Sequence, residues 1–153
     1  MFSGIDKSYQ DTTITNDGFW PDLHAGEFEK RRGIPAAQDA DNITYAIVAA
    51  IEEVNPLLAT LKANYMADGF TKASEVTGKA KIDDKNGLEI QYERAVFARA
   101  KADLLPDIAT LSQRDAGNNI AERSHETRSE LLGESQRIIR NMLGQTRATV
   151  DLL

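Results

Sequence analysis

Two histidines and several acidic pairs are the first residues of this chain to consider for metal binding or acid–base catalysis. His24 and His125 are the only histidines, and they lie too far apart in the sequence to form a metal-ligand motif. Neither has a neighbouring partner of the kind that a general base needs. The acidic pairs Glu52-Glu53 and Asp83-Asp84 are adjacent in sequence, so on a helix they would not share a face. We therefore predict exposed or capping histidines and solvated carboxylates.

A possible calcium loop lies around Gly87. With Gly87 at the sixth position, Asp84, Asn86 and Glu93 fall on the third, fifth and twelfth positions of an EF-hand loop. The first position, however, falls on Ile82, whose side chain has no oxygen. We predict a structural turn that caps the following helix, and no metal site.

Other catalytic signatures are absent from the sequence. The chain has no cysteine, which excludes disulfides, zinc ribbons, iron–sulfur sites and a cysteine nucleophile. It also has no glycine-rich phosphate loop, nucleophile elbow or His-Glu zinc motif. We predict that the protein is not an enzyme and takes no cofactor.

Composition narrows the class of protein further. The 153 residues include 18 Lys and Arg against 24 Asp and Glu, which gives a net charge of −6. This length suits one domain, and the acidic balance disfavours general nucleic-acid binding, which rests on Lys and Arg. The longest apolar stretch, 45–51, is shorter than the ~18 residues of a membrane span. No signal segment opens the chain. We expect a soluble, intracellular protein with no membrane partner.

The first half of the chain predicts helices. Pro21 suits the start of a short helix to about Arg32. A stronger helix begins after Asp39 or Asp41. Asn55 and Pro56 then predict the N-cap and the first residue of a further helix, which ends at Gly69. The two helices are either in tandem or parts of one kinked helix. The apolar stripe of the middle helix has spacings of three and four: Ile43, Ala46, Ile47, Ala50, Ile51 and Val54.

The second half predicts a loop and two long helices. Residues 70–87 form a long lysine-bearing loop, in which Val76 and Ile82 could form a small β-hairpin. Residues 88–113 favour a helix with two apolar faces, kinked or divided by Pro106. A turn at 115–119 precedes a last helix from Asn119 to about Leu143.

The two ends of the chain are not helical in pattern. Residues 1–20 are polar, with isolated aromatic anchors at Phe2, Tyr9, Phe19 and Trp20. These anchors would clasp a neighbouring subunit or, alternatively, fill the core of their own chain. For residues 1–10 a frayed terminus is a further alternative. Residues 146–153 alternate polar and apolar types and are strand-like.

The predicted fold is therefore all-α. It is a bundle of about four main helices at 21–145, with an extended arm at 1–20 and a docking tail at 146–153. Arg94 and Arg99 lie within its most apolar helix. Their side chains either reach the surface along their stems or form ion pairs at a subunit boundary.

Three short motifs resemble the head completion protein (GpL) family of peduovirus-like tailed phages. They occur in the same order as in that family, and the likeness extends from Phe19 to Leu153. The motifs are Phe19-Trp20-Pro21-Asp22, then Phe70-Thr71-Lys72-Ala73-Ser74-Glu75-Val76, then Tyr92-Glu93-Arg94-Ala95-Val96 with Ala98 and Ala100.

This resemblance implies a virion connector without catalytic residues. Such a protein joins the portal after DNA packaging, stabilises the filled head and offers a docking surface to neck or tail terminator proteins. The resemblance also implies a twelve-fold ring of copies in the head–tail neck, assembled in the host cytoplasm, through which double-stranded DNA passes without specific binding.

From these expectations follow our hypotheses about binding residues. We predict that a tail formed by Thr149, Val150, Asp151, Leu152 and Leu153 docks on the portal by adding a strand to a sheet edge. The acidic charge predicts a channel wall that repels DNA phosphates, with the glutamates of the last helix as candidates. The alternatives are a small helical DNA-binding protein of phage packaging or regulation and a small metal-dependent enzyme.

Overall fold

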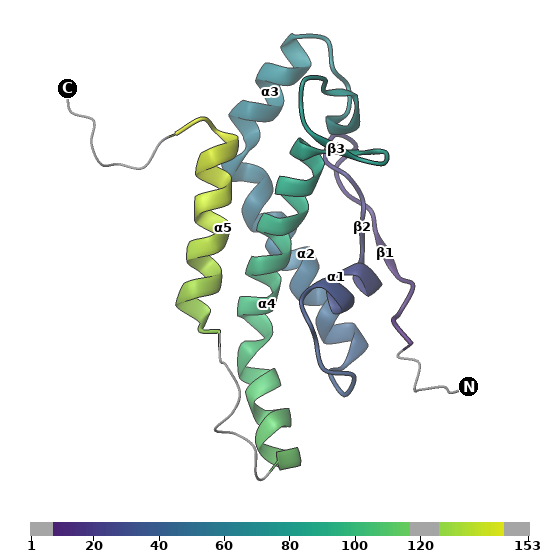
Figure 1. Cartoon of the computed structure of the whole chain (residues 1–153), viewed down its shortest axis with the longest axis vertical. Coiled ribbons are helices and arrows are strands. Elements are labelled where there is room, and N and C mark those ends of the chain that lie inside the picture. The colour runs from purple at the N-terminus through teal and green to yellow at the C-terminus, as the bar shows by residue number, and fades with distance from the viewer. Residues whose placement is uncertain (1–7, 117–125, 146–153) are drawn as a thin grey trace, which may run out of the picture.

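Three long helices form the body of the molecule. The structure, a computed structural model, describes residues 8–116 and 126–145. Within them, α4 (Gly87–Ala116) packs against both α2 (Ala40–Leu57) and α5 (Arg128–Met142) (Figure 1). The predicted helical bundle is thus present in outline. The all-α prediction is incomplete, because two small antiparallel strand pairs accompany the helices.

Helix α2 forms where its sequence pattern predicts it. The Asp39 side chain accepts a hydrogen bond from the Asn42 N–H at 3.0 Å and so caps the helix. Every residue of the predicted apolar stripe is buried: Ile43, Ala46, Ile47, Ala50, Ile51 and Val54.

The bend after α2 differs from the prediction in its position. Helix α2 runs on through Pro56 to Leu57, and α3 (Ala59–Ala67) begins after Leu58 at 63° to it. The tandem arrangement is confirmed, and so is the end at Gly69, which has a positive φ of 102°. The prediction that Asn55 caps the second helix is wrong, because its side chain is hydrogen-bonded to Tyr92 instead.

Helix α3 extends from one end of the molecule (Figure 1) and has no fully buried residue. Among the described helices no single one is long and apolar enough to cross a membrane, although α2 and α3 jointly meet those criteria as a bent pair.

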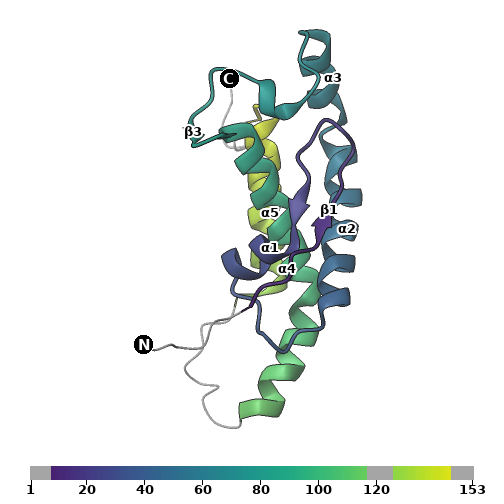
Figure 2. The same cartoon turned by 90° about the vertical axis from the view of Figure 1, so that its right-hand side faces the viewer.

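A two-stranded ribbon near the N-terminus was not expected. Strand β1 (Thr13–Ile14) pairs with β2 (Leu23–His24), and α1 (Ala25–Arg31) follows directly. The predicted helix from Pro21 therefore starts later, because Leu23 and His24 are held in the ribbon. The ribbon lies along the side of the helices and contacts α2 (Figure 2). The predicted boundary between the arm (1–20) and the helical bundle (21–145) falls inside the loop that joins β1 to β2.

The central loop contains a short 3-10 helix and a hairpin. Residues Ala73–Glu75 form η1, and β3 (Lys81–Ile82) pairs with β4 (Lys85–Asn86). Asp83 in the hairpin turn has a positive φ of 53°. The predicted hairpin therefore exists and includes Ile82. It does not include Val76, which is buried next to η1.

Of the two alternatives at Pro106, a kink or a division, the division is wrong. The turn predicted at 115–119 is wrong in its first two residues, and the rest of it lies outside the described residues. Helix α4 continues through Pro106 to Ala116 without dividing, so residues 115 and 116 are helical instead of forming a turn. Helix α5 begins at Arg128, because Thr127 is in an extended conformation and forms a capping box with Glu130. The predicted start at Asn119 lies outside the described residues. Gly144 ends the helix as predicted, with a φ of 76°.

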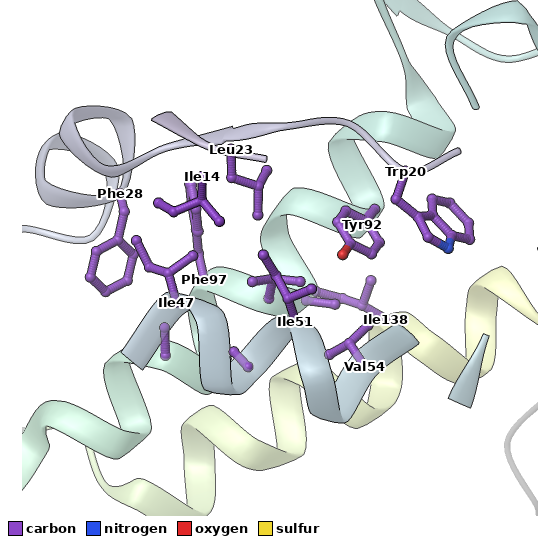
Figure 3. Packing of buried hydrophobic residues seen from close by; sticks show 14 of the residues in the cluster. Ile14, Trp20, Leu23, Phe28, Ile47, Ile51, Val54, Tyr92, Phe97 and Ile138 are labelled. Carbon is purple, nitrogen blue, oxygen red and sulfur yellow. The ribbon is translucent and has the colours of Figure 1, made fainter. Parts of the chain in front are cut away.

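The hydrophobic core lies between the ribbon and the helices. Figure 3 shows Ile14, Trp20 and Leu23 from the N-terminal segment facing side chains of α2 and α4, with Ile138 of α5 beneath. The segment from Ile14 to Leu23 is therefore an integral layer of the domain.

Candidate functional site

The three motifs that carry the family resemblance meet at one place in the structure. The backbone N–H of Ala73, at the start of η1, donates a hydrogen bond to the carbonyl of Phe19 at 2.9 Å. The indole of Trp20 stacks on the ring of Tyr92 in α4, with centroids 4.8 Å apart and an interplanar angle of 4°. Segments that are distant in sequence are thus joined into one structural unit, which we call the motif junction (residues 15–22, 70–76 and 86–92).

Asn16 is the centre of the polar part of the motif junction. Its Nδ2 donates to the Pro21 carbonyl and to Tyr92 Oη, both at 2.9 Å. Its Oδ1 accepts from the Asp17 N–H at 2.8 Å and from Asn55 Nδ2 at 3.1 Å. Tyr92 Oη in turn donates to Asn55 Oδ1 at 2.6 Å. Burial raises the pKa of Tyr92, so the phenol stays protonated and can donate this bond.

Asp17 shapes the turn that presents Phe19 and Trp20 to the core. Its Oδ1 accepts from both of their backbone N–H groups at 2.9 Å, and its Oδ2 accepts from Lys62 Nζ at 3.0 Å. Burial by itself would raise the pKa of Asp17, but the hydrogen bonds from the Trp20 N–H, Lys62 and the Phe19 N–H together lower it. Gly18 supplies the positive φ of 95° that this turn requires.

The segment tested above as a calcium loop holds η1 against α4. Asn86 Nδ2 donates to the carbonyls of Ala73 and Val76 at 2.9 and 3.2 Å. Its Oδ1 accepts from the Glu89 N–H at 2.9 Å, and Glu89 Oε1 accepts from the Asn86 N–H at 3.1 Å. This reciprocal pair caps the start of α4, and the prediction of a structural turn is confirmed.

A hollow of about 330 Å³ opens beside the motif junction. Its wall includes the charged side chains of Asp22, Lys72 and Glu89. Nearby, Trp20 Nε1 is buried without a hydrogen-bond partner among the described residues. Within the described ranges no three His, Cys, Asp or Glu side chains are grouped so as to hold a metal ion. The residues that line the hollow include no histidine.

The predicted arm residues have different environments. Phe19 and Trp20 are buried in the core of their own chain, with 3% and 2% of their surface exposed, which corrects the prediction that they clasp a neighbouring subunit. Tyr9 is 41% exposed. Phe2 and the predicted tail residues Thr149, Val150, Asp151, Leu152 and Leu153 lie outside the described residues, as does His125. His24 Nδ1 lies 3.1 Å from Thr13 Oγ1 across the ribbon.

Arg94 and Arg99 form ion pairs within their own chain. Arg94 lies 3.6 Å from Glu134 of α5, and Arg99 lies 3.2 Å from Glu53 of α2. Glu134 also takes two hydrogen bonds from Arg32, at 3.1 and 2.7 Å. These bonds from Arg32, and the charges of Arg32 and Arg94, lower the pKa of Glu134. Glu134, one of the glutamates of the last helix proposed for a channel wall, is therefore paired with arginines of its own chain.

Several residues of this site were not singled out from the sequence. Asn16 precedes Asp17-Gly18, a typical turn sequence, and that signal could have located it. Ser135 is buried in α5, where its Oγ donates to the Ala95 carbonyl at 2.9 Å and accepts from Arg99 Nε at 3.2 Å. The spacing of Ser135 from Leu131 and Ile138 places it on the buried side of the last helix. No local signal predicts its hydrogen-bond partners, because they come from another helix.

Comparisons with known proteins confirm the family resemblance of the sequence. A family model described as phage head completion protein (GPL) matches residues 14–153. A relative from Haemophilus phage HP1 (strain HP1c1), named "Probable head completion/stabilization protein", is 40% identical over 154 residues, with 100% of both chains covered. A relative from Escherichia phage P2, named "Head completion/stabilization protein", is 26% identical over 141 residues, with 90% of this chain and 81% of the relative covered. No solved structure matches the chain.

Proposed function

The chain belongs to the phage head completion protein (GPL) family, and on this basis we propose that it completes and stabilises the phage head as a structural connector. The observation that carries the proposal is the family match over residues 14–153, joined to full-length similarity with a head completion/stabilization protein.

The motif junction supports a structural role. The motifs that carry the resemblance contribute core packing, turns and helix caps, and in the described residues they do not form a nucleophile–base or metal-ligand group. Residues in these roles fix the shape of the domain and the positions of its surfaces.

The proposed position is the head–tail neck of the virion. Copies of the chain would form a ring, twelve-fold if it matches the related adaptors, on the portal, and would offer the opposite side to neck or tail terminator proteins. The tail at 146–153 remains our candidate for the portal contact. In this position DNA passes through the ring, and the net charge of −6 opposes its retention on the wall.

The experiment that tests this function is complementation. A phage that lacks the corresponding gene is grown in host cells that express this chain or an unrelated acidic helical protein. We expect the chain to restore DNA-filled, infectious particles and to be found in them, whereas the control protein leaves heads that lose their DNA. Filled heads that form equally well without the chain would contradict the proposal.

A gel shift with duplex DNA at physiological salt separates this function from the alternative of a DNA-binding protein. Connector function predicts no shift. A shift at low micromolar protein would favour the alternative.

A further inference from the structure

One face of α2 is exposed and has an unusual composition. Asp41, Tyr45, Val48 and Glu52 follow each other at spacings of four, three and four, so they lie on one side of the helix. Tyr45 is 74% exposed and Val48 is 43% exposed. We call this set the tyrosine face.

The tyrosine face is acidic as well as apolar. From residue 33 to residue 61 the chain has four acidic residues and no Lys or Arg. Neither Asp41 nor Glu52 takes part in an ion pair with any described residue. The face thus presents a large aromatic ring between two uncompensated negative charges.

Helix α5 carries an exposed face of the opposite charge. Ser129, Gly133, Arg137 and Arg140 recur at spacings of four, four and three, on the side of α5 away from its buried residues. Arg137 and Arg140 are exposed and form no ion pair within the described ranges. We call this set the arginine face.

The arginine face also has open space over its small residues. A Cβ placed on Gly133 would meet only Arg137 Nη1, at 3.6 Å, so the surface over Gly133 is open to a neighbour. Ser129 and Gly133 are small, which leaves room for a projecting tyrosine. Arginine guanidinium groups pack well on tyrosine rings and pair with carboxylates. Arginine and tyrosine are both enriched in protein interfaces.

We propose that the tyrosine face of α2 in one copy of this chain packs against the arginine face of α5 in the next copy. This inference rests on the proposed function, in which several copies act together. Because the contact joins two different surfaces, it repeats from copy to copy and closes into a ring if the rotation allows. In this arrangement the carboxylates of Asp41 and Glu52 lie in the contact between subunits instead of on the channel wall.

Disulfide trapping tests this contact directly, because the natural chain has no cysteine. The variant Val48→Cys/Ser129→Cys is oxidised as purified protein and inside complemented particles. We expect a ladder of dimers, trimers and larger species, whereas Val48→Cys alone and Ser129→Cys alone stay monomeric. The matched control Val48→Cys/Thr60→Cys, with its second cysteine on exposed α3, should form no ladder.

Other outcomes would overturn the inference. Dimers from Val48→Cys alone would mean that α2 meets α2, and cross-links to a different virion protein would mean that this face has another partner. No ladder in either setting, with the variant still present in filled particles, contradicts the contact but leaves the proposed function intact. Loss of complementation by the unmodified chain contradicts the function itself.

Charge reversal gives an independent measurement. Asp41→Lys/Glu52→Lys and Arg137→Glu/Arg140→Glu should each weaken self-association about tenfold or more in sedimentation velocity. Combining all four changes should restore much of the association, and circular dichroism checks that each variant is folded. If the acidic-face variant instead binds duplex DNA and self-associates normally, α2 lines the channel and the inference is wrong.

Discussion

The indole of Trp20 lies parallel to the phenol ring of Tyr92, 4.8 Å away and tilted by 4°. This contact joins the turn at the tip of the N-terminal ribbon to the first turns of α4. Trp20 is 2% exposed and Tyr92 is fully buried. The N-terminal segment is therefore fixed to the bundle by aromatic packing as well as by hydrogen bonds.

Replacing Trp20 should strongly destabilise the fold. We expect Trp20→Ala to lower the free energy of unfolding by about 3–5 kcal/mol, because it removes a large buried side chain. Trp20→Phe should cost less than half as much, since Nε1 has no hydrogen-bond partner to lose among the described residues. Urea unfolding followed by far-UV circular dichroism measures both variants. Equal costs would contradict the expectation that a phenyl ring retains much of the packing of the indole.

The hydroxyl of Tyr92 should be coupled energetically to Asn55. Tyr92→Phe leaves Asn16 and Asn55 without a shared partner and should cost about 1–3 kcal/mol. A double-mutant cycle with Asn55→Ala should give a coupling energy of about 0.5 kcal/mol or more. Additive effects would mean that the 2.6 Å contact between Tyr92 Oη and Asn55 contributes nothing to stability.

Stability should depend on pH through Glu134. Its pKa in the folded state is lowered below 4.5 by hydrogen bonds from Arg32, so its contribution is present above pH 4.5 and lost as the pH falls through the lowered value. Glu134→Gln should therefore lower the free energy of unfolding by about 1–2 kcal/mol at pH 7. The difference from the natural chain should shrink as the pH falls below 4.5. A difference that stays constant with pH would contradict the role of the ionised carboxylate.

Gly26 should be intolerant of a side chain. A Cβ at this position in α1 would collide with the backbone carbonyl of Gln10, which lies in the segment leading to β1. We expect Gly26→Ala to cost about 1–3 kcal/mol by forcing that segment away. The matched control is Gly133→Ala in α5, where the space is open and alanine should stabilise the helix by about 0.5–1 kcal/mol. The Tm values of the two variants should move in opposite directions.

Removing residues 146–153 should separate folding from assembly. We expect the shortened chain to keep the Tm of the full chain, because the described core ends with Met142 and Leu143. We also expect it to fail to bind portal rings in a pull-down, in which the full chain binds. Unchanged portal binding would overturn the assignment of this segment as the docking tail.

The sequence by itself determined the main helices and several of their ends. The stripe of α2, its cap at Asp39 and the glycines at 69 and 144 are local signals, since each depends on residues within one or two turns. The absence of cysteine and the acidic charge likewise came from composition alone. The family resemblance also came from the sequence, as three short motifs in order.

Tertiary structure decided how those motifs work together. Nothing local shows that Trp20 stacks on Tyr92, that Asn55 serves Tyr92 instead of capping a helix, or that Ser135 bonds to α4. The ribbon of β1 and β2 was missed because each strand has only two residues, too few to show alternation. Helix α4 passes through Pro106 despite the lost hydrogen bond. These outcomes depend on contacts between distant segments, whose energies outweigh local preference only once the chain is folded.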